Sequence, residues 1–216
     1  MGVIIEQFPL YVSGFLTTLR LVLIAGVLSI ILGTIIAAFR VSPVPPLRLV
    51  GTGWVTVFRN TPLAVVLFAT AFGLPEIGVN SSYFVFGVLG LVLYTSAFVC
   101  EAIRSGINSV SAGQAEAARA VGLTFGQSLS LIVLPQAFRT VIPPLGSVLI
   151  AMIKNSAIAG AFGIGGDLFA NGVQLTSAQG YSAAGVLFGV MLGYLVLTIP
   201  GGILLGVLER KLAVAR

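Results

Sequence analysis

Three consecutive polar residues inside a long apolar run are the side chains of this sequence best placed to do chemistry. Lys154 follows the apolar residues 150–153 and is itself followed by Asn155 and Ser156. Charged side chains at the depth of a bilayer are rare, and they usually face a protein interior or a water-filled cavity. Lys154 comes fifteen residues after Arg139, which is about 22 Å along a helix. We therefore expect Lys154, Asn155 and Ser156 to line a polar passage; the alternative is that Lys154 snorkels to the membrane interface.

Three further charged residues lie within or at the ends of apolar runs. Arg59 either lines the same passage or extends its long side chain to the membrane interface. Glu101 and Arg104 are three residues apart, so they share one face of a helix, and we expect a structural ion pair between them.

The sequence has none of the residue sets that catalysis or metal binding requires. It contains no His and a single Cys, Cys100. The commonest metal ligand and proton shuttle is therefore missing, and a disulfide framework is excluded. Gly-x-Ser-x-Gly and Walker A sequences are missing as well. We predict that the chain is not an enzyme and has no catalytic residue, no metal site and no cofactor.

The longest polar interruption of the chain contains two helix starts. Ser111 with Gln114, and Thr124 with Gln127, both have the spacing of a capping box, in which side chains satisfy the free backbone N–H groups. Gly122 lies between them, where the end of a helix favours a left-handed residue. The pattern predicts a short helix, a glycine turn and a second helix.

The first of these short helices is rich in small side chains. Glu116, Ala117, Ala118 and Ala120 all precede the glycine turn. Alanines leave a helix surface on which another protein can approach closely, so residues 109–127 are predicted to be a docking loop. The alternative is an amphipathic helix that rests on the membrane surface.

The composition predicts the environment that holds these residues. Of 216 residues, 57% are hydrophobic and 8% are charged, and the mean hydropathy is +1.11. Soluble domains have about 25% charged residues, so we expect a single all-α membrane domain over residues 1–216.

Glu6–Leu19 is predicted to be a short amphipathic helix at the interface. Five spans are expected at about residues 21–39, 49–72, 83–103, 128–161 and 183–208. Thr61 and Pro62 predict a break in the second span, with Thr61 as N-cap and Pro62 as the first helical residue.

The charges of the connecting segments predict the orientation. With five alternating spans, one side receives Arg40, Arg48, Arg104, Arg119, Arg210, Lys211 and Arg216. In the loops 75–82 and 163–180 on the other side, the charged residues are all acidic. Because cytoplasmic loops are enriched in Lys and Arg, we expect the N-terminus outside, and the C-terminus and residues 109–127 in the cytoplasm. The net charge of +5 is explained in this way without a nucleic-acid partner.

The docking loop resembles that of a known family. Glu116-Ala117-Ala118, Gly122, Ile132 and Leu134-Pro135, at their spacing in this sequence, resemble the EAA loop of bacterial ABC importer permeases. The resemblance implies that Glu116, Ala117, Ala118 and Gly122 belong to a coupling helix that fits a cleft of a separate ATP-hydrolysing subunit.

Other segments resemble the group of these permeases that takes up polar amino acids. The segments are Arg59-Asn60-Thr61-Pro62-Leu63, residues 101–107, Gly113-Gln114, Pro135-Gln136-Ala137 and Lys154-Asn155-Ser156. Asn60 departs from the glycine that is usual there. The resemblance implies a multi-pass protein of the bacterial inner membrane that works with a second permease, two ATP-binding subunits and an external substrate-binding protein. The implied substrate is an amino acid, and a cation at Lys154 would favour acidic or neutral ones.

A secondary transporter and a membrane scaffold are the alternative function classes. A secondary transporter would show inverted repeats and intramembrane acidic residues, and neither is evident in the sequence. A membrane scaffold or export-apparatus subunit without transport of its own stays open, since five spans and a docking loop would suit it too. Co-purification of an ATPase through residues 109–125 would distinguish the two.

Overall fold

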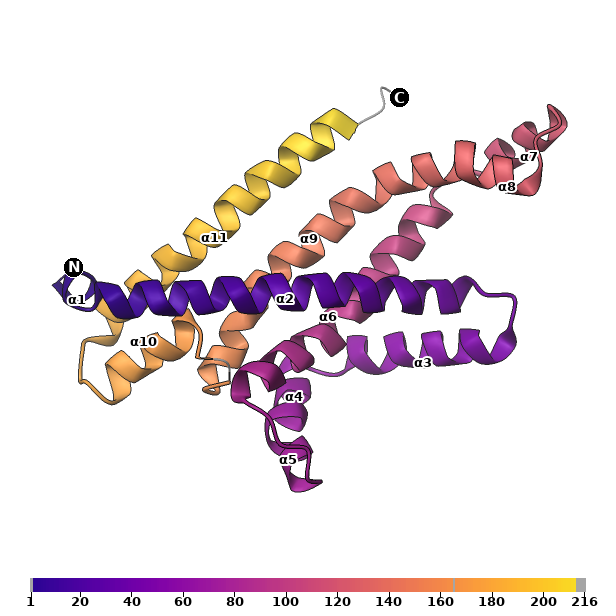
Figure 1. Ribbon diagram of the computed structural model, residues 1–216. Helices are drawn as coiled ribbons and strands as arrows, with labels where there is room; N and C mark the ends of the chain where they lie inside the picture. Colours follow the sequence, from indigo (N-terminus) through magenta and orange to yellow (C-terminus); the bar gives the residue numbers. More distant parts are fainter. Residues whose placement is uncertain (1, 165, 213–216) are drawn as a thin grey trace.

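The computed structural model describes residues 2–164 and 166–212, and these residues form helices joined by short loops. Arg216, which was expected on the cytoplasmic side, lies outside the described residues. Figure 1 shows the arrangement. The α-helices are α1 (Gly2–Glu6), α2 (Phe8–Val41), α3 (Pro45–Asn60), α4 (Leu63–Phe68), α5 (Leu74–Glu76), α6 (Tyr83–Asn108), α7 (Ala112–Ala120), α8 (Phe125–Gln127), α9 (Leu134–Ala161), α10 (Leu168–Ser177) and α11 (Ala183–Leu212). Two π-helical segments, η1 (Ala69–Gly73) and η2 (Ser128–Val133), join α4 to α5 and α8 to α9.

Four stretches of the described chain are long and apolar enough to cross a membrane. They are Phe8–Val41, Tyr83–Asn108, Ser130–Ala161 and Ala183–Lys211. A fifth candidate is the pair Pro45–Asn60 and Leu63–Glu76, which bends by 106°. The expected all-α class with several spans is therefore confirmed, with four or five spans depending on this bent pair.

The first helix differs from the expectation. Glu6–Leu19 is not a separate interfacial helix, because α2 begins at Phe8 and continues without a break to Val41. The exposed Arg20 does not interrupt it, since Arg is a good helix former and its long side chain can extend away from the apolar surface. At 34 residues, α2 is about 50 Å long and exceeds the roughly 30 Å hydrocarbon core.

The chain breaks at Thr61 and Pro62, as expected, but the two residues have different roles. Thr61 ends α3 and its hydroxyl donates to the carbonyl of Val57 at 2.8 Å. Pro62 precedes α4 as its N-cap, so it is not the first helical residue. Thr61 is extended (φ −97°, ψ 131°) because the proline ring disfavours a helical conformation in the residue before it.

One helix was missed by the sequence interpretation. The loop 163–180 contains α10, whose N-terminus is capped by Asp167: the carboxylate accepts a hydrogen bond from the backbone N–H of Ala170 at 3.0 Å. The signal was an Asp directly before an apolar pair, a common helix start, in a segment otherwise rich in glycine.

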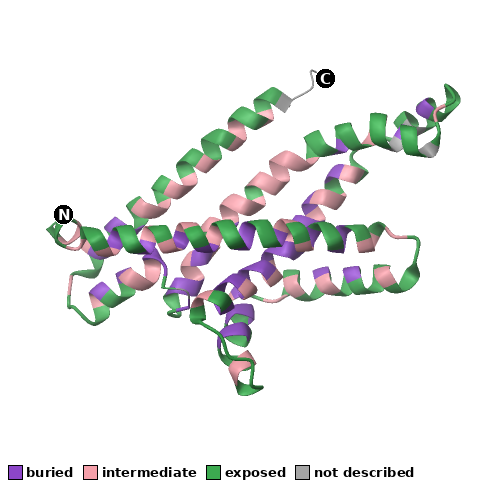
Figure 2. Cartoon of the chain, viewed as in Figure 1, coloured by how far each residue is buried: buried purple, intermediate pink, exposed green. Residues whose placement is uncertain are grey.

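The core lies around α6, which packs against α2, α3, α4 and α9. Figure 2 shows the buried residues concentrated along α6 and the neighbouring parts of α2 and α4. Leu21, Leu67, Leu91 and Met152 fill the centre of this cluster. Gly33 lets α2 approach α6 closely, since a Cβ at position 33 would lie 2.6 Å from the Cβ of Val99 in α6.

Candidate functional site

The predicted docking loop forms a helical hairpin at the end of α6. Gly122 has φ +88°, which confirms the expected left-handed turn. The N–H of Gly122 donates to the carbonyl of Arg119 at 3.0 Å, and that of Leu123 to Ala118 at 3.1 Å. This pair of bonds is a Schellman motif, which satisfies carbonyl groups at the end of a helix. These two hydrogen bonds therefore fix the geometry of the turn after α7.

The two expected capping boxes have different outcomes. Thr124 and Gln127 form one: the Thr124 N–H donates to Gln127 Oε1 at 2.9 Å, and the Gln127 N–H donates to Thr124 Oγ1 at 3.3 Å. Ser111 does precede α7 as its N-cap, but its side chain makes no capping hydrogen bond. The first box is thus wrong in its bonds and right in its position.

The residues of α7 face different ways. Glu116 and Ala117 are exposed, as is Gly122. Ala118 is only 6% exposed, on a helix that packs against η2. The small side chain of Ala118 is therefore covered within this chain, and Glu116 and Ala117 are exposed residues of the predicted docking surface.

The two membrane helices on either side of the hairpin are joined to each other by side-chain hydrogen bonds. The Ser109 hydroxyl donates to Thr140 Oγ1 at 2.9 Å, and the Thr140 hydroxyl lies 3.1 Å from the carbonyl of Gly106. Gly106 packs directly on Val141 of α9, where no larger residue would fit. The hairpin, whose helix α7 packs against η2, therefore lies between two membrane helices that are fastened to each other.

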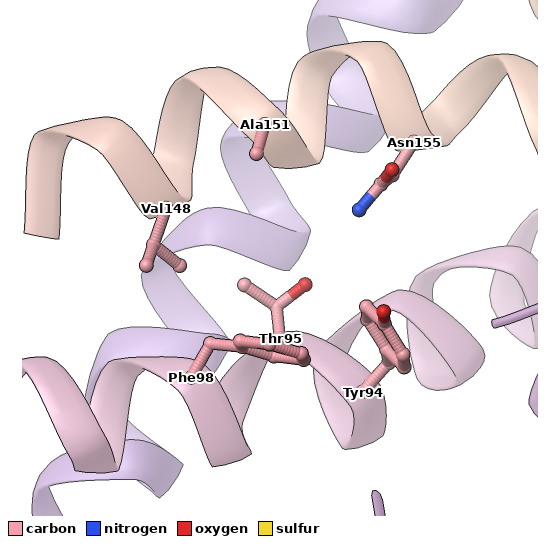
Figure 3. Close-up of a pocket in the computed structure, with 6 residues that line it drawn as sticks. All are labelled: Tyr94, Thr95, Phe98, Val148, Ala151 and Asn155. Atoms are coloured by element: carbon pink, nitrogen blue, oxygen red, sulfur yellow. The ribbon is translucent and has the colours of Figure 1, made fainter. Parts of the chain in front are cut away.

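A pocket of about 180 Å³ lies between α6 and α9. It is lined by Tyr94, Thr95, Phe98, Val148, Ala151 and Asn155. In Figure 3 the side chains of Thr95 and Asn155 extend into the pocket from opposite helices, above the rings of Tyr94 and Phe98. The two rings pack 4.9 Å apart, centroid to centroid, and Figure 3 also shows the hydroxyl group of Tyr94 at the pocket.

Thr95 has an unused hydrogen-bonding group in this pocket. Its residue is 2% exposed, and its Oγ1 is buried without a hydrogen-bond partner among the described residues. A buried polar group without a partner costs about 1–3 kcal/mol. Sequence reasoning missed Thr95, because a single Thr in a long apolar helix gives no signal of its own.

The three residues expected to line a passage do not share one environment. Asn155 lines the pocket. Lys154 is exposed and is not among the described residues that line the pocket. Ser156 is fully buried, donates to the carbonyl of Ile153 at 2.8 Å, and lies 3.5 Å from the hydroxyl of Tyr194. Successive residues of a helix point about 100° apart, which separates the three.

Arg59 belongs to an ion cluster that joins three helices. Glu101 pairs with Arg104 at 3.1 Å, which confirms the expected pair, and also with Arg59 at 3.5 Å and with Arg40. The guanidinium of Arg59 lies 5.6 Å from the ring centroid of Phe98. Arg59 is therefore held beside the pocket, and the free snorkelling conformation is not the one observed.

Comparison with known proteins gives consistent matches over most of the chain. Residues 29–214 match the family described as "Binding-protein-dependent transport system inner membrane component". The chain is 42% identical over 212 residues to the "Probable glutamine ABC transporter permease protein GlnM" of Bacillus subtilis, which covers 98% of this chain and 97% of that protein. It is also 42% identical over 221 residues to the "Glutamate transport system permease protein GluC" of Corynebacterium efficiens, covering 96% of each.

A solved structure shares the fold. In the "Crystal structure of an amino acid ABC transporter with histidines", one chain matches with a TM-score of 0.90 and 34% identity, covering 96% of both chains. At this coverage the similarity includes the hairpin and the pocket-lining helices as well as the bent pair.

Proposed function

The chain belongs to the family of binding-protein-dependent transport system inner membrane components, and we propose that it moves an acidic or polar amino acid of the glutamate or glutamine type into the cytoplasm. It is a non-catalytic, multi-pass permease subunit of the bacterial inner membrane. The observation that carries the substrate class is 42% identity over almost the whole length of a glutamine and a glutamate permease. These matches also favour transport over the scaffold alternative.

The remaining subunits of the importer follow from the family. The partners are a pair of ATP-binding subunits, a second permease that is a copy or a paralogue, and an external protein that delivers the amino acid. The spans α9 and α11 support a partner within the membrane, because only 11% and 6% of their most apolar windows are buried within this chain. The lipid bilayer covers the rest, and the function requires no nucleic acid, cofactor or metal.

Helix α7 is the coupling helix, with Glu116 and Ala117 facing the ATPase and Gly122 fixing the turn. The N-terminus lies outside and the C-terminus in the cytoplasm, in accord with the Lys and Arg residues on the α7 side of the chain. Since the hairpin lies between α6 and α9, which Ser109, Gly106 and Thr140 fasten to each other, closure of the ATPase pair would move the same two helices that line the pocket.

The pocket between α6 and α9 is the substrate site of this permease. Its volume of about 180 Å³ suits one amino acid, and Thr95 and Asn155 supply the hydrogen bonds. A substrate that bonds to Thr95 Oγ1 would satisfy a buried group that lacks a partner among the described residues. The exposed Lys154 lies one residue from Asn155 and lines the wider passage between the two permeases.

Charge reversal on α7 tests the coupling. We expect Glu116→Lys to reduce ATP-dependent uptake of radiolabelled glutamine and glutamate at least 10-fold in proteoliposomes that contain the permease, the ATPase and the binding protein. A surface of the ATPase that is complementary to Glu116 carries positive charge, and it would be repelled by a Lys at this position. Glu76→Lys is the matched control, since Glu76 is also exposed but lies in α5, away from α7 (Figure 1).

Uptake without ATP, or equal uptake by both charge-reversal variants, would contradict the coupling assignment. The amount of ATPase that co-purifies with each variant separates lost docking from lost transmission.

A further inference from the structure

The ion cluster beside the pocket has an unbalanced charge. Among the described residues, three guanidinium groups, from Arg40, Arg59 and Arg104, share one carboxylate, that of Glu101. Three positive charges against one negative leave an excess of two. Charges of like sign held close together at the edge of a membrane are costly unless anions reduce their repulsion. The cluster therefore has capacity for a further carboxylate.

Arg59 is the member of the cluster that is least tied to Glu101. Its 3.5 Å contact is longer than the 3.1 Å contact of Arg104, and its side chain is 46% exposed, against 17% for Arg40. Release of Arg59 would leave Glu101 paired with both other arginines. Breaking an ion pair is expensive when it leaves a buried charge without a partner. Release of Arg59 does not leave the Glu101 carboxylate in that condition.

The helix that presents Arg59 is fixed without this ion pair. Trp54 donates from Nε1 to Ser96 Oγ of α6 at 3.1 Å, and Trp54 also packs on Phe58 with ring centroids 4.5 Å apart. Arg59 lies in the last turn of α3, where the helix dipole favours a cation. The guanidinium can therefore move while its backbone stays in place.

The position of Arg59 connects the cluster to the pocket. Its guanidinium is 5.6 Å from the centre of the Phe98 ring, and Phe98 lines the pocket. An Arg side chain that packs on an aromatic ring retains this contact over a range of positions. A small shift across the ring would bring the guanidinium to the rim of the pocket, where it could hold a carboxylate through two parallel hydrogen bonds.

We propose that Arg59 is the carboxylate receptor of this permease and that Glu101 holds its place when the pocket is empty. The α-carboxylate of the arriving amino acid replaces Glu101 as the partner of Arg59, while Thr95 and Asn155 bind the polar remainder. The site selects for amino acids with a free carboxylate. This inference rests on the proposed function, since it assigns one group of the same substrate site.

The test measures binding to the permease–ATPase complex in nanodiscs, without the binding protein. The probes are L-glutamine and its α-amide, in which a carboxamide replaces the α-carboxylate. We expect the wild-type complex to bind glutamine at least 10-fold more tightly than the amide, the order expected for one charge-assisted hydrogen bond. Arg59→Gln should bind the two probes within about 2-fold of each other.

Arg104→Gln is the matched control, because it removes a guanidinium from the same carboxylate on a helix face away from Phe98. It should retain the preference for glutamine over the amide. A second variant, Glu101→Gln, should tighten glutamine binding to a folded complex, since the competing carboxylate is gone.

Three outcomes would overturn the inference: a preference for glutamine in Arg59→Gln equal to that of the wild type, loss of the preference in Arg104→Gln to the same extent, or no glutamine binding by the wild-type complex. In each case, ATP-dependent uptake by the complete importer would leave the proposed function intact. Failure of that uptake would instead contradict the proposed function itself.

Discussion

At the scale of single residues, the polar group of Asp167 finds its hydrogen-bond partners through contacts between distant segments. Asp167 is fully buried. Its carboxylate accepts hydrogen bonds from the Ala170 N–H at 3.0 Å and from the Tyr194 hydroxyl at 2.9 Å. Thr18 of α2 accepts the N–H of Leu168 at 3.0 Å beside it. The network joins α2, α10 and α11, and Gly160 of α9 packs directly against the carboxylate.

Asp167 makes the stability of the chain depend on pH. Burial raises the pKa of the Asp167 carboxyl above its ordinary value, although the hydrogen bonds from Ala170 and Tyr194 act in the opposite direction. The folded protein therefore binds this proton more tightly than the unfolded chain does. The contribution of Asp167 to stability is fully present below the ordinary carboxyl pKa of about 3.9, and it is lost as the pH rises through the folded-state pKa.

Two substitutions at this position should have opposite effects. Asp167→Asn keeps a good N-cap and cannot ionise, so we expect the variant to have a higher Tm than the wild type at pH 8 and a smaller difference at pH 5. Asp167→Ala leaves the Ala170 N–H and the Tyr194 hydroxyl without a partner, and we expect a loss of about 1–3 kcal/mol at both pH values. Thermal unfolding of the purified permease at the two pH values measures both effects. An Asn variant as unstable as the Ala variant at pH 8 would show that the charge of Asp167 is required.

Local pairs of residues could be predicted from the sequence, and long-range pairs could not. Glu101 and Arg104 were expected as a pair because they are one helical turn apart. The contacts of Glu101 with Arg40 and Arg59, and of Asp167 with Tyr194, join residues on different helices. Spacing in the sequence gives no information about which helices pack together. For the same reason, Asp167 was interpreted as an acidic residue of an outside loop.

At the scale of elements, the sequence predicted where apolar helices lie better than where they begin. The expected span 83–103 corresponds to α6, but the helix continues to Asn108 because helical backbone does not stop at the edge of the hydrocarbon. The expected interfacial helix and α2 are one element, since no proline or glycine pair separates Leu19 from Leu21. Gly122 and the Thr124 capping box were predicted because turn chemistry is local.

Two glycines of the coupling hairpin provide a test of that turn. Gly122 and Gly113 both have open space where a Cβ would be added, but only Gly122 has a positive φ. We expect Gly122→Val to cost about 1–2 kcal/mol through the left-handed backbone, to tilt α7 and to reduce uptake. Gly113→Ala, in the helical part of α7, should be neutral or stabilising by up to about 1 kcal/mol.

The readouts for this pair are the amount of permease inserted in the membrane, the ATPase retained on purification, and uptake. Normal retention and uptake in Gly122→Val would mean that the turn does not position Glu116 for docking. A defect of the same size in Gly113→Ala would mean that the whole hairpin is sensitive to substitution. That outcome would contradict a specific role of Gly122.

At the scale of the whole molecule, the docking hairpin and the loop between α5 and α6 lie at different ends of the fold (Figure 1). If α7 meets a cytoplasmic ATPase, residues 77–82 must face the outside, because α6 joins the two as one membrane span. The pair formed by α3 and α4–α5 is bent by 106°, so its helices alone do not show whether it crosses the membrane. The side on which residues 77–82 lie determines this.

Single cysteines on these two segments determine the orientation. Asn80→Cys should react with an impermeant thiol reagent on whole cells, and Ala120→Cys only in inside-out vesicles, since both positions are exposed. The wild-type chain is the control, because its Cys100 is fully buried and should react from neither side. Assembly with the ATPase should protect Ala120→Cys and leave Asn80→Cys reactive, because the coupling cleft covers α7 alone. Labelling of both positions from the same side would mean that α6 does not cross the membrane, and the transmission of ATPase closure through α6 to the pocket would then be impossible.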